Sequence, residues 1–131
     1  MRRRPSTGLS ILDKMPLIMV VDDEVDITET YALYFSLHDF EVVTANDAVR
    51  ALALIGERIP DLIVSDCMMP YMDGVEFSRR VKANPATRHV PIILMSGAPD
   101  LHDLSSPSYN AFLVKPVLLP VLMQEMARLL K

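Results

Sequence analysis

The feature that most constrains the fold is an alternation of short apolar runs with longer segments of helical periodicity. The apolar runs cover residues 17–21, 41–45, 62–65, 91–95 and 111–114. Most of them are continuous rather than alternating, which is typical of strands buried on both faces of a parallel sheet. The candidate helices between and after them cover residues 25–38, 47–58, 74–83 and 117–131. This order predicts an α/β fold with a parallel sheet covered on both faces.

Apolar positions at helical spacing indicate which helix faces should meet the sheet. The expected core-facing residues are Ile27, Tyr31, Tyr34 and Leu37, then Val49, Leu52 and Ile55, and in the last helix Val117, Val121, Met123 or Gln124, and Leu129 or Leu130. Asp73 and Glu76 have the spacing of a capping box, so we expect the third helix to begin beside Asp73.

The composition excludes several classes of protein. Of 131 residues, 50% are hydrophobic and 23% are charged, which is typical of one folded domain rather than a disordered chain. The single cysteine, Cys67, excludes an internal disulfide framework and a cysteine-rich zinc site. No apolar run approaches the roughly 18 residues of a membrane span. The basic N-terminus lacks the apolar stretch of a secretory signal, so we expect a cytoplasmic protein.

Charge is distributed unevenly along the chain. The first sixteen residues carry a formal charge of +3 and the remainder −7, which together give −4. We expect residues 1–16 to form a basic flexible tail. The alternative is a basic arm that contacts an acidic partner or a membrane surface. The domain over 17–131 is too acidic to favour binding to nucleic acid.

Polar residues follow four of the five apolar runs. Asp22 and Asp23 follow the first run, Asp66 the third, Ser96 the fourth and Lys115 the fifth. Singly, such residues are usually helix caps, turn residues or surface charges. However, ligands of open parallel sheets bind beyond the carboxyl ends of the strands. We therefore expect these five side chains to converge on one site.

Three carboxylates held close together repel one another, and a divalent cation such as Mg²⁺ (or Mn²⁺) relieves that repulsion. Ser96 would add a hydroxyl donor and Lys115 a cation for an anionic group. Carboxylates, a divalent cation, a hydroxyl and a lysine are the groups that phosphoryl transfer requires. The sequence therefore predicts a site for phosphoryl chemistry.

Four segments resemble the receiver domain of two-component response regulators. They are VVDDE (20–24), DLIVSDCMMPYMDG (61–74), PIILMSG (91–97) and FLVKP (112–116). The resemblance covers residues 17–131 and implies a flavodoxin-like, doubly wound five-stranded parallel sheet in the order 2-1-3-4-5. It implies a phosphorylatable signalling switch rather than an enzyme. The implied partners are a sensor histidine kinase or phosphotransfer protein and a downstream protein, with the chain a monomer or weak dimer.

The resemblance also implies roles for individual residues. Asp66 would be the phosphoacceptor, attacking the phosphorus of a phosphohistidine. Asp23, Asp66 and the backbone carbonyl of Met68 would ligate the metal ion, and Asp22 would hold it mainly through water. Ser96 and Lys115 would bind the new phosphoryl group.

Further residues of the family pattern support that site. Phe112 is at the position of the family's switch aromatic, and the Lys115–Pro116 bond is expected to be cis. The residues expected to shape the loop after the acceptor are Pro70, Asp73 and Gly74. Met68, Met69 and Met72 are expected to be packing and loop residues.

The sequence departs from the family pattern between Ser96 and Lys115, where the chain is shorter than is common. Pro99 and Pro107 lie in this stretch, so we expect a short or irregular fourth helix and greater mobility over 98–109. Asn110 replaces a usual glycine, and we expect it to tolerate the left-handed backbone of that turn. Met68 and Ala98, which flank the acceptor site, are apolar and predict slow loss of the phosphoryl group.

Other functions remain possible from the sequence. A phosphorylation-independent pseudo-receiver would use the same fold as an interaction module. A haloacid-dehalogenase-type phosphohydrolase would need a second aspartate two residues after Asp22, where Glu24 stands. A flavodoxin would need a phosphate-binding loop after the first run. Because no residue follows Lys131, we expect the signal to pass to a separate protein, unless the chain is part of a longer one.

Overall fold

The computed structural model describes residues 15–97 and 108–131. The predictions of a basic tail over 1–16 and of a short or irregular helix after Ser96 therefore fall almost wholly outside the described residues. The same holds for the mobility expected over 98–109 and for the position of Ala98.

Five parallel strands form one sheet in the order β2-β1-β3-β4-β5. The strands are β1 (Leu17–Val21), β2 (Glu41–Ala45), β3 (Leu62–Asp66), β4 (Ile92–Ser96) and β5 (Ala111–Val114). This order confirms the predicted topology. In register, β1 pairs residue by residue with β2 from Leu17 opposite Glu41, and β4 pairs with β5 up to Ser96 opposite Val114.

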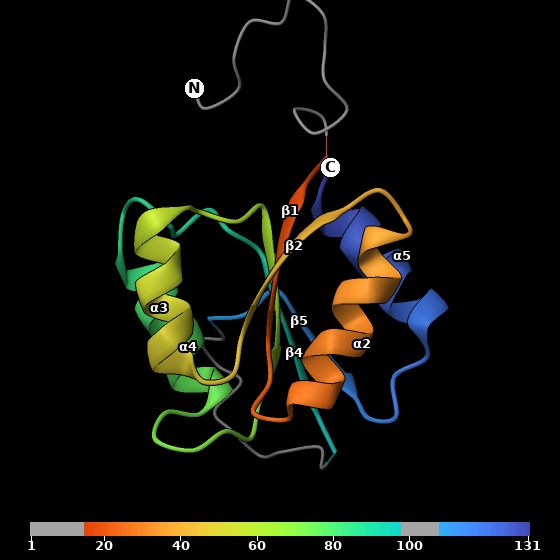
Figure 1. The fold of residues 1–131 in the computed structure, drawn as a ribbon. Helices are drawn as coiled ribbons and strands as arrows, with labels where there is room; N and C mark the ends of the chain where they lie inside the picture. The colour runs from red at the N-terminus through yellow and green to blue at the C-terminus, as the bar shows by residue number, and fades with distance from the viewer. Residues whose placement is uncertain (1–14, 98–107) are drawn as a thin grey trace, which may run out of the picture.

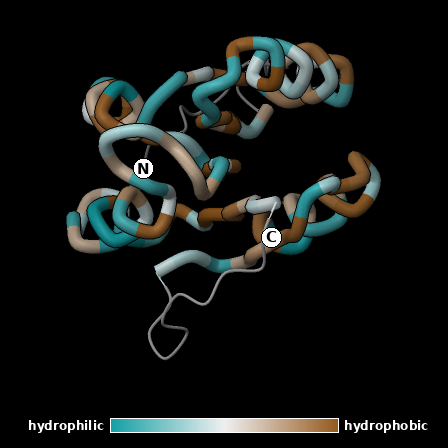
Figure 2. The backbone as a smooth tube through the Cα atoms, turned by 90° about the horizontal axis from the view of Figure 1, so that it is seen from below, coloured by the Kyte–Doolittle hydropathy of each residue, from teal (hydrophilic) through white to brown (hydrophobic). Residues whose placement is uncertain are grey.

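Helices cover both faces of the sheet (Figure 1). Helices α2 (Val25–Ser36) and α5 (Leu119–Leu129) lie on one face, and α3 (Ala48–Glu57) and α4 (Gly74–Ala83) lie on the other. Figure 2, which views the molecule along the strands, shows the sheet between these two layers. Among the helices of the described ranges, none is long and apolar enough to cross a membrane.

The core is divided into two clusters by the sheet. Strands β1, β3 and β4 are buried along their whole length, because they are the inner strands, whereas β2 and β5 are the partly exposed edges. Side chains that alternate along a strand point to opposite faces. Met19 accordingly belongs to the cluster beneath α3 and α4, while its neighbours Ile18 and Val20 belong to the cluster beneath α2 and α5.

The predicted helix faces were partly wrong. Leu37 is 72% exposed and Val49 is 57% exposed, although both were expected in the core. In α2, Phe35 is fully buried instead. In α3, the small residues Ala48 and Ala51 contact the core. Alanine lets a helix approach the sheet closely, and a pattern based on large apolar side chains does not reveal it.

The last helix shows a similar shift. Val121 is 43% exposed, while Leu122 and Met126 are fully buried. The helix begins at Leu119, two residues later than expected, with Pro120 in its first turn. Proline is well accommodated there because the first turn has no intrahelical acceptor for its missing N–H.

Asn110 does not adopt the left-handed backbone that was expected of it. Among the described non-glycine residues, positive φ occurs at Asp39 and Tyr71. Asn110 instead uses its side chain: Oδ1 accepts hydrogen bonds from Ile92 N–H at 2.9 Å and from Lys82 Nζ at 3.0 Å. These bonds hold the beginning of edge strand β5 against β4 and the end of α4.

Candidate functional site

Three carboxylates meet at the carboxyl ends of β1 and β3. Asp22 and Asp23 directly follow β1, and Asp66 is the last residue of β3. One oxygen atom of each lies within 4.8 Å of the other two. Asp22 and Asp66 are buried, whereas Asp23 is exposed. Strands β1 and β3 are hydrogen-bonded neighbours, and this pairing brings residues far apart in sequence together.

Lys115 extends from the end of β5 to this cluster. Its Nζ lies 2.9 Å from Asp66 Oδ1 and 3.9 Å from Asp22 Oδ2. Its backbone N–H donates to Ser96 O at 2.7 Å, and the Lys115–Pro116 bond is cis. Burial lowers the pKa of Lys115, but the hydrogen bond to Asp66 and the two carboxylate charges outweigh that effect and raise the pKa. The ammonium therefore stays protonated beside the carboxylates.

The Asp22 carboxylate is buried, where a negative charge is unfavourable. Its Oδ1 accepts the backbone N–H of Glu24 at 2.9 Å, while its buried Oδ2 has no hydrogen-bond partner among the described residues. Burial is the main cause of a raised pKa at Asp22; the bond from Glu24 works in the opposite direction. The Lys115 ammonium, 3.9 Å from Oδ2, is too distant to donate a hydrogen bond, and a buried carboxylate oxygen without such a bond costs free energy. The oxygen-only donor set and the orphaned oxygen therefore fit Mg²⁺ or Mn²⁺.

Ser96 and Phe112 occupy different surroundings. Ser96 is buried at the end of β4, next to β3 and β5, and so belongs to the same edge of the sheet as the carboxylates. Phe112 lies in the second position of β5 and packs, partly buried, against the cluster beneath α3 and α4. Its ring centroid is 5.8 Å from that of Tyr109.

The loop after Asp66 is held at its end by α4. Gly74 N–H donates to Cys67 O at 2.8 Å. A Cβ at position 74 would lie 2.7 Å from Asp66 O and 2.9 Å from Cys67 Cα, so glycine is required by the close approach of the two backbones.

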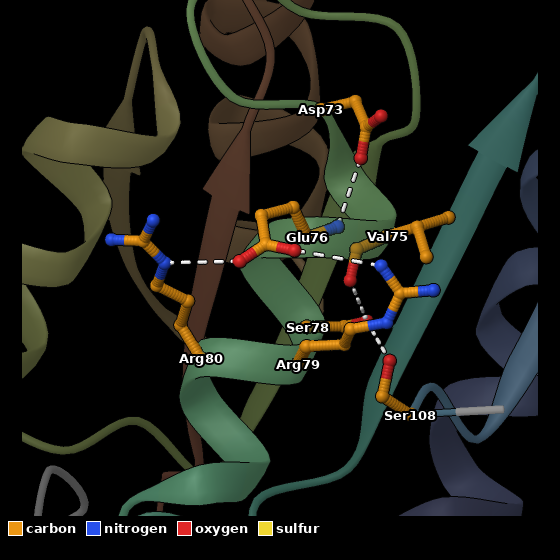
Figure 3. Close-up of polar contacts among 7 residues, drawn as sticks. All are labelled: Asp73, Val75, Glu76, Ser78, Arg79, Arg80 and Ser108. Atoms are coloured by element: carbon orange, nitrogen blue, oxygen red, sulfur yellow. Dashed lines mark hydrogen bonds and ion pairs between the residues drawn. The ribbon is translucent and has the colours of Figure 1, made fainter. Parts of the chain in front are cut away.

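Asp73 caps α4 by accepting Glu76 N–H at 2.8 Å (Figure 3). The Glu76 carboxylate does not form the second hydrogen bond of a capping box. It forms ion pairs with Arg79 and Arg80 on the same helix instead. Farther along α4, the Ser78 hydroxyl donates a hydrogen bond to Val75 O and is also hydrogen-bonded to the Ser108 hydroxyl. The bond to Ser108 joins the helix to the chain entering β5.

Sequence reasoning missed three residues around the site. Asn46 Nδ2 donates to Asp22 O at 3.0 Å, and Tyr31 contributes a hydroxyl bonded to Met95 Sδ at 3.8 Å. Tyr71, in the loop after Asp66, has φ 70° and is 92% exposed. The residue type at position 71 gives no signal for this, because tyrosine, unlike glycine, asparagine and aspartate, does not mark a positive φ.

The methionines of that loop divide between packing and exposed loop positions. Met69 and Met72 are partly buried against the core cluster beneath α3 and α4. Met68, in contrast, is 64% exposed.

Comparison with known proteins agrees with this architecture. The family profile "Response regulator receiver domain" matches residues 18–127. Response regulator PleD of Caulobacter vibrioides is 36% identical over 103 residues, which are 76% of this chain and 23% of PleD. The phosphate regulon regulator PhoB of Pseudomonas aeruginosa is 38% identical over 79 residues, 60% of this chain and 34% of PhoB. The chain thus spans about a quarter to a third of these relatives.

Solved structures are similar over most of the chain. The receiver domain of a signal transduction histidine kinase from Syntrophus aciditrophicus has a TM-score of 0.81 and 29% identity, with coverage of 88% of this chain and 89% of that one. Response regulator TrrA of Thermotoga maritima, in complex with Mg²⁺ and BeF, has a TM-score of 0.79 and 28% identity. Coverage is 88% of this chain and 99% of TrrA.

Proposed function

The chain belongs to the response regulator receiver domain family, and from this premise we propose that it is a phosphorylatable switch whose acceptor is Asp66. Receiver domains are signalling domains of two-component systems. The observation that carries the proposal is the convergence of three carboxylates with a lysine at one edge of the sheet. Asp66 is the member of this cluster that is buried and contacted directly by Lys115.

In the proposed reaction, an Asp66 carboxylate oxygen attacks the phosphorus of a phosphohistidine on a sensor histidine kinase or phosphotransfer protein. The bond between phosphorus and the imidazole nitrogen breaks, and its electron pair stays with the imidazole. The product is an acyl phosphate on Asp66. Lys115 Nζ, held 2.9 Å from Asp66 Oδ1, would pair with an oxygen of the new phosphoryl group, and the Ser96 hydroxyl would donate to another.

The carboxylate cluster would hold a divalent cation during this transfer. Asp23, Asp66 and the Met68 carbonyl would be the direct ligands, and Asp22 would act mainly through water. A bound Mg²⁺ or Mn²⁺ neutralises charge on the phosphoryl oxygens. The orphaned Asp22 oxygen and the repulsion among the carboxylates support this assignment, because both are relieved by a cation.

Phosphorylation would then alter the surface read by a downstream protein or linked domain. A dianionic group next to Lys115 and Ser96 changes the charge at the ends of β4 and β5. Phe112 is the family's candidate for the responding aromatic, and its partial burial beside Tyr109 leaves a side chain that could change its packing.

The test is labelling with a small phosphodonor. Acetyl phosphate with Mg²⁺ should give an acid-labile phosphoryl adduct of at most one per chain, and Asp66→Asn should abolish it. Asp26→Asn, which removes an exposed carboxylate in the first turn of α2, is the matched control and should leave labelling intact. Absence of labelling in the wild-type protein would favour the phosphorylation-independent module, whereas repeated turnover of a phosphate ester would favour a phosphohydrolase.

A further inference from the structure

Asn46 contacts the segment of chain that carries the acidic pair. It directly follows edge strand β2, and its side-chain amide extends to the chain that leaves β1. Asn46 Nδ2 donates to Asp22 O at 3.0 Å and lies 3.4 Å from Thr28 Oγ1, to which it also donates. One amide group therefore links the end of β1 to the first turn of α2. Between these two contacts lies Asp23, the exposed member of the carboxylate cluster.

The partners of Asn46 determine the orientation of its amide. Asp22 O is a carbonyl oxygen and can only accept a hydrogen bond. The Thr28 hydroxyl has one proton, which it donates to Val25 O at 2.9 Å, so its oxygen is left to accept. Both partners consequently require the NH₂ group of Asn46 on this side. A side chain without an N–H or O–H group at position 46 would leave Asp22 O without this bond.

The bond to Asp22 O replaces a hydrogen bond of the sheet. Asp22 N–H donates to Ala45 O at 3.1 Å, so the pairing of β1 with β2 extends to this residue. In a parallel ladder that continued, Asp22 O would next accept the N–H of Asp47. Asp47 is instead the N-cap of α3, where its carboxylate accepts Arg50 N–H at 2.7 Å. The Asn46 amide thus supplies the donor that is lost when the chain turns into α3.

This bond fixes the peptide unit that joins Asp22 to Asp23. Asp22 is held at its N–H by Ala45 and at its carbonyl by Asn46. The Asp23 carboxylate, in contrast, makes no hydrogen bond to any residue of the described ranges. The position of that carboxylate is therefore set by the backbone on either side of it, and the carbonyl held by Asn46 belongs to the peptide that precedes it.

Resting on the proposed cation site, we propose that Asn46 is a positioning residue for that site. It holds the Asp22–Asp23 peptide so that the Asp23 carboxylate stays near Asp22 and Asp66 before a cation binds. The three carboxylates repel one another, and the exposed Asp23 is the one that can turn toward solvent when the bond is absent. A cation would then have to order the loop as it binds, which lowers its affinity. Groups that orient metal ligands commonly affect metal affinity in this way.

The affinity of the full chain for Mg²⁺, measured by isothermal titration calorimetry at neutral pH, tests this role. Asn46→Leu removes the donor and keeps a similar volume, whereas Asn46→Gln keeps an amide on an exposed side chain. Thr44→Leu, which is exposed on the same edge strand, is the matched control. Amide hydrogen exchange at Asp23 and Glu24 in the metal-free protein is the second measurement, and urea denaturation reports the free energy of unfolding.

We expect Asn46→Leu to raise the Kd for Mg²⁺ by about tenfold. Amide exchange at Asp23 and Glu24 should be faster in the metal-free variant than in the metal-free wild type. Labelling by acetyl phosphate should be slower when the Mg²⁺ concentration is below the wild-type Kd, and should equal the wild-type rate at saturating Mg²⁺. Asn46→Gln should bind Mg²⁺ within about twofold of wild type, because it retains the donor. Thr44→Leu should bind as wild type.

The inference is overturned if Asn46→Leu lowers the free energy of unfolding but leaves the Kd for Mg²⁺ unchanged, since the role of Asn46 would then be structural only. It is overturned as well if Asn46→Leu and Asn46→Gln weaken binding equally, or if slow labelling persists at saturating Mg²⁺. A wild-type protein that binds no Mg²⁺ would overturn both the cation site and the inference. A wild-type protein that binds Mg²⁺ but is not labelled would overturn the proposed phosphoryl transfer alone, and the Kd values would still decide the role of Asn46.

Discussion

Lys115 Nζ donates a hydrogen bond to Asp66 Oδ1 at 2.9 Å, so the proposed acceptor carboxylate is engaged by a cation before any phosphoryl group arrives. The same ammonium lies 3.9 Å from Asp22 Oδ2. It therefore offsets part of the repulsion among the three carboxylates. A metal ion bound by the same carboxylates would be repelled by the ammonium, because both are positively charged.

Replacing Lys115 with methionine should consequently tighten Mg²⁺ binding. Removal of one positive charge a few ångströms from the metal site corresponds to roughly 1 kcal/mol at a partly exposed site, or about a fivefold lower Kd. Isothermal titration calorimetry on Lys115→Met measures this directly. Lys131→Met, at the end of the chain, should leave the affinity unchanged. A weaker Mg²⁺ affinity in Lys115→Met would contradict the proposed placement of the metal ion.

Gly74→Ala should destabilise the fold and impair the acceptor. The new Cβ would lie 2.7 Å from Asp66 O, so the α4 terminus or the β3 end must move. Overpacking of this kind costs about 1–3 kcal/mol. Urea denaturation should show that loss, and labelling by acetyl phosphate should slow.

Gly56→Ala is the matched control, because a Cβ there meets no atom within 4 Å and the residue lies inside α3. That variant should be more stable by up to about 1 kcal/mol. Equal stability of the two variants would contradict the close approach of the backbone at Gly74 to Asp66 O.

Tyr71→Gly should make the protein more stable. The strain of positive φ at a bulky residue costs on the order of 1 kcal/mol, and a side chain that is 92% exposed loses little on removal. Glycine also increases the entropy of the unfolded chain, which offsets part of the gain. We expect a net increase of about 0.5 kcal/mol in the free energy of unfolding, measured by urea denaturation. A loss of 1 kcal/mol or more would mean that the ring has internal contacts.

The sequence was sufficient to predict the sheet and the convergence of the carboxylates with Lys115, for a physical reason. Buried parallel strands must be continuous apolar runs, and the polar residues that end them are then placed by the strand register. This is why β1 and β5 match their predicted bounds and why Asp22, Asp66 and Lys115 could be expected at one edge. Hydrogen-bonded pairing between neighbouring strands then brings these strand ends together at that edge.

Helix faces and loop geometry were less predictable. Leu37 and Val49 were assigned to the core because they are large and apolar, whereas Phe35 and the alanines of α3 are buried. The choice depends on how each helix rotates against the sheet, which a one-dimensional pattern does not specify. Asn110 was expected to supply backbone freedom, but supplies a hydrogen-bond acceptor to Lys82 and Ile92. That role depends on residues distant in the sequence.

The Glu41–Arg58 ion pair should make a small contribution to stability that depends on pH. Arg58 Nη1 and Nη2 donate to Glu41 at 2.6 and 2.7 Å, and this hydrogen bonding lowers the pKa of Glu41 from its usual 4.5. A lowered folded pKa means that the stabilisation is present above 4.5 and is lost as the pH falls through the folded value. Because Arg58 is 61% exposed, the pair should contribute less than about 1 kcal/mol at neutral pH.

A double-mutant cycle with Glu41→Gln and Arg58→Met measures that coupling. It should be present at pH 7, be reduced by high salt, and decrease as the pH falls below 4.5. Coupling that does not change with pH would show that the two side chains interact by packing rather than by charge.

The phosphoryl group on Asp66 should be long-lived because of Met68. Hydrolysis requires a water molecule oriented toward the phosphorus, and a thioether is too weak an acceptor to orient one. Met68 is two residues after Asp66, and its 64% exposed side chain carries no strong hydrogen-bonding group. Replacement with glutamate supplies an acceptor and should accelerate dephosphorylation by at least about tenfold. Leu33→Glu, equally exposed on α2, adds the same charge elsewhere and should leave the rate unchanged. The loss of radiolabel from purified phosphoprotein in Mg²⁺ gives the rate, and a wild-type lifetime of only seconds would mean that another group orients the water.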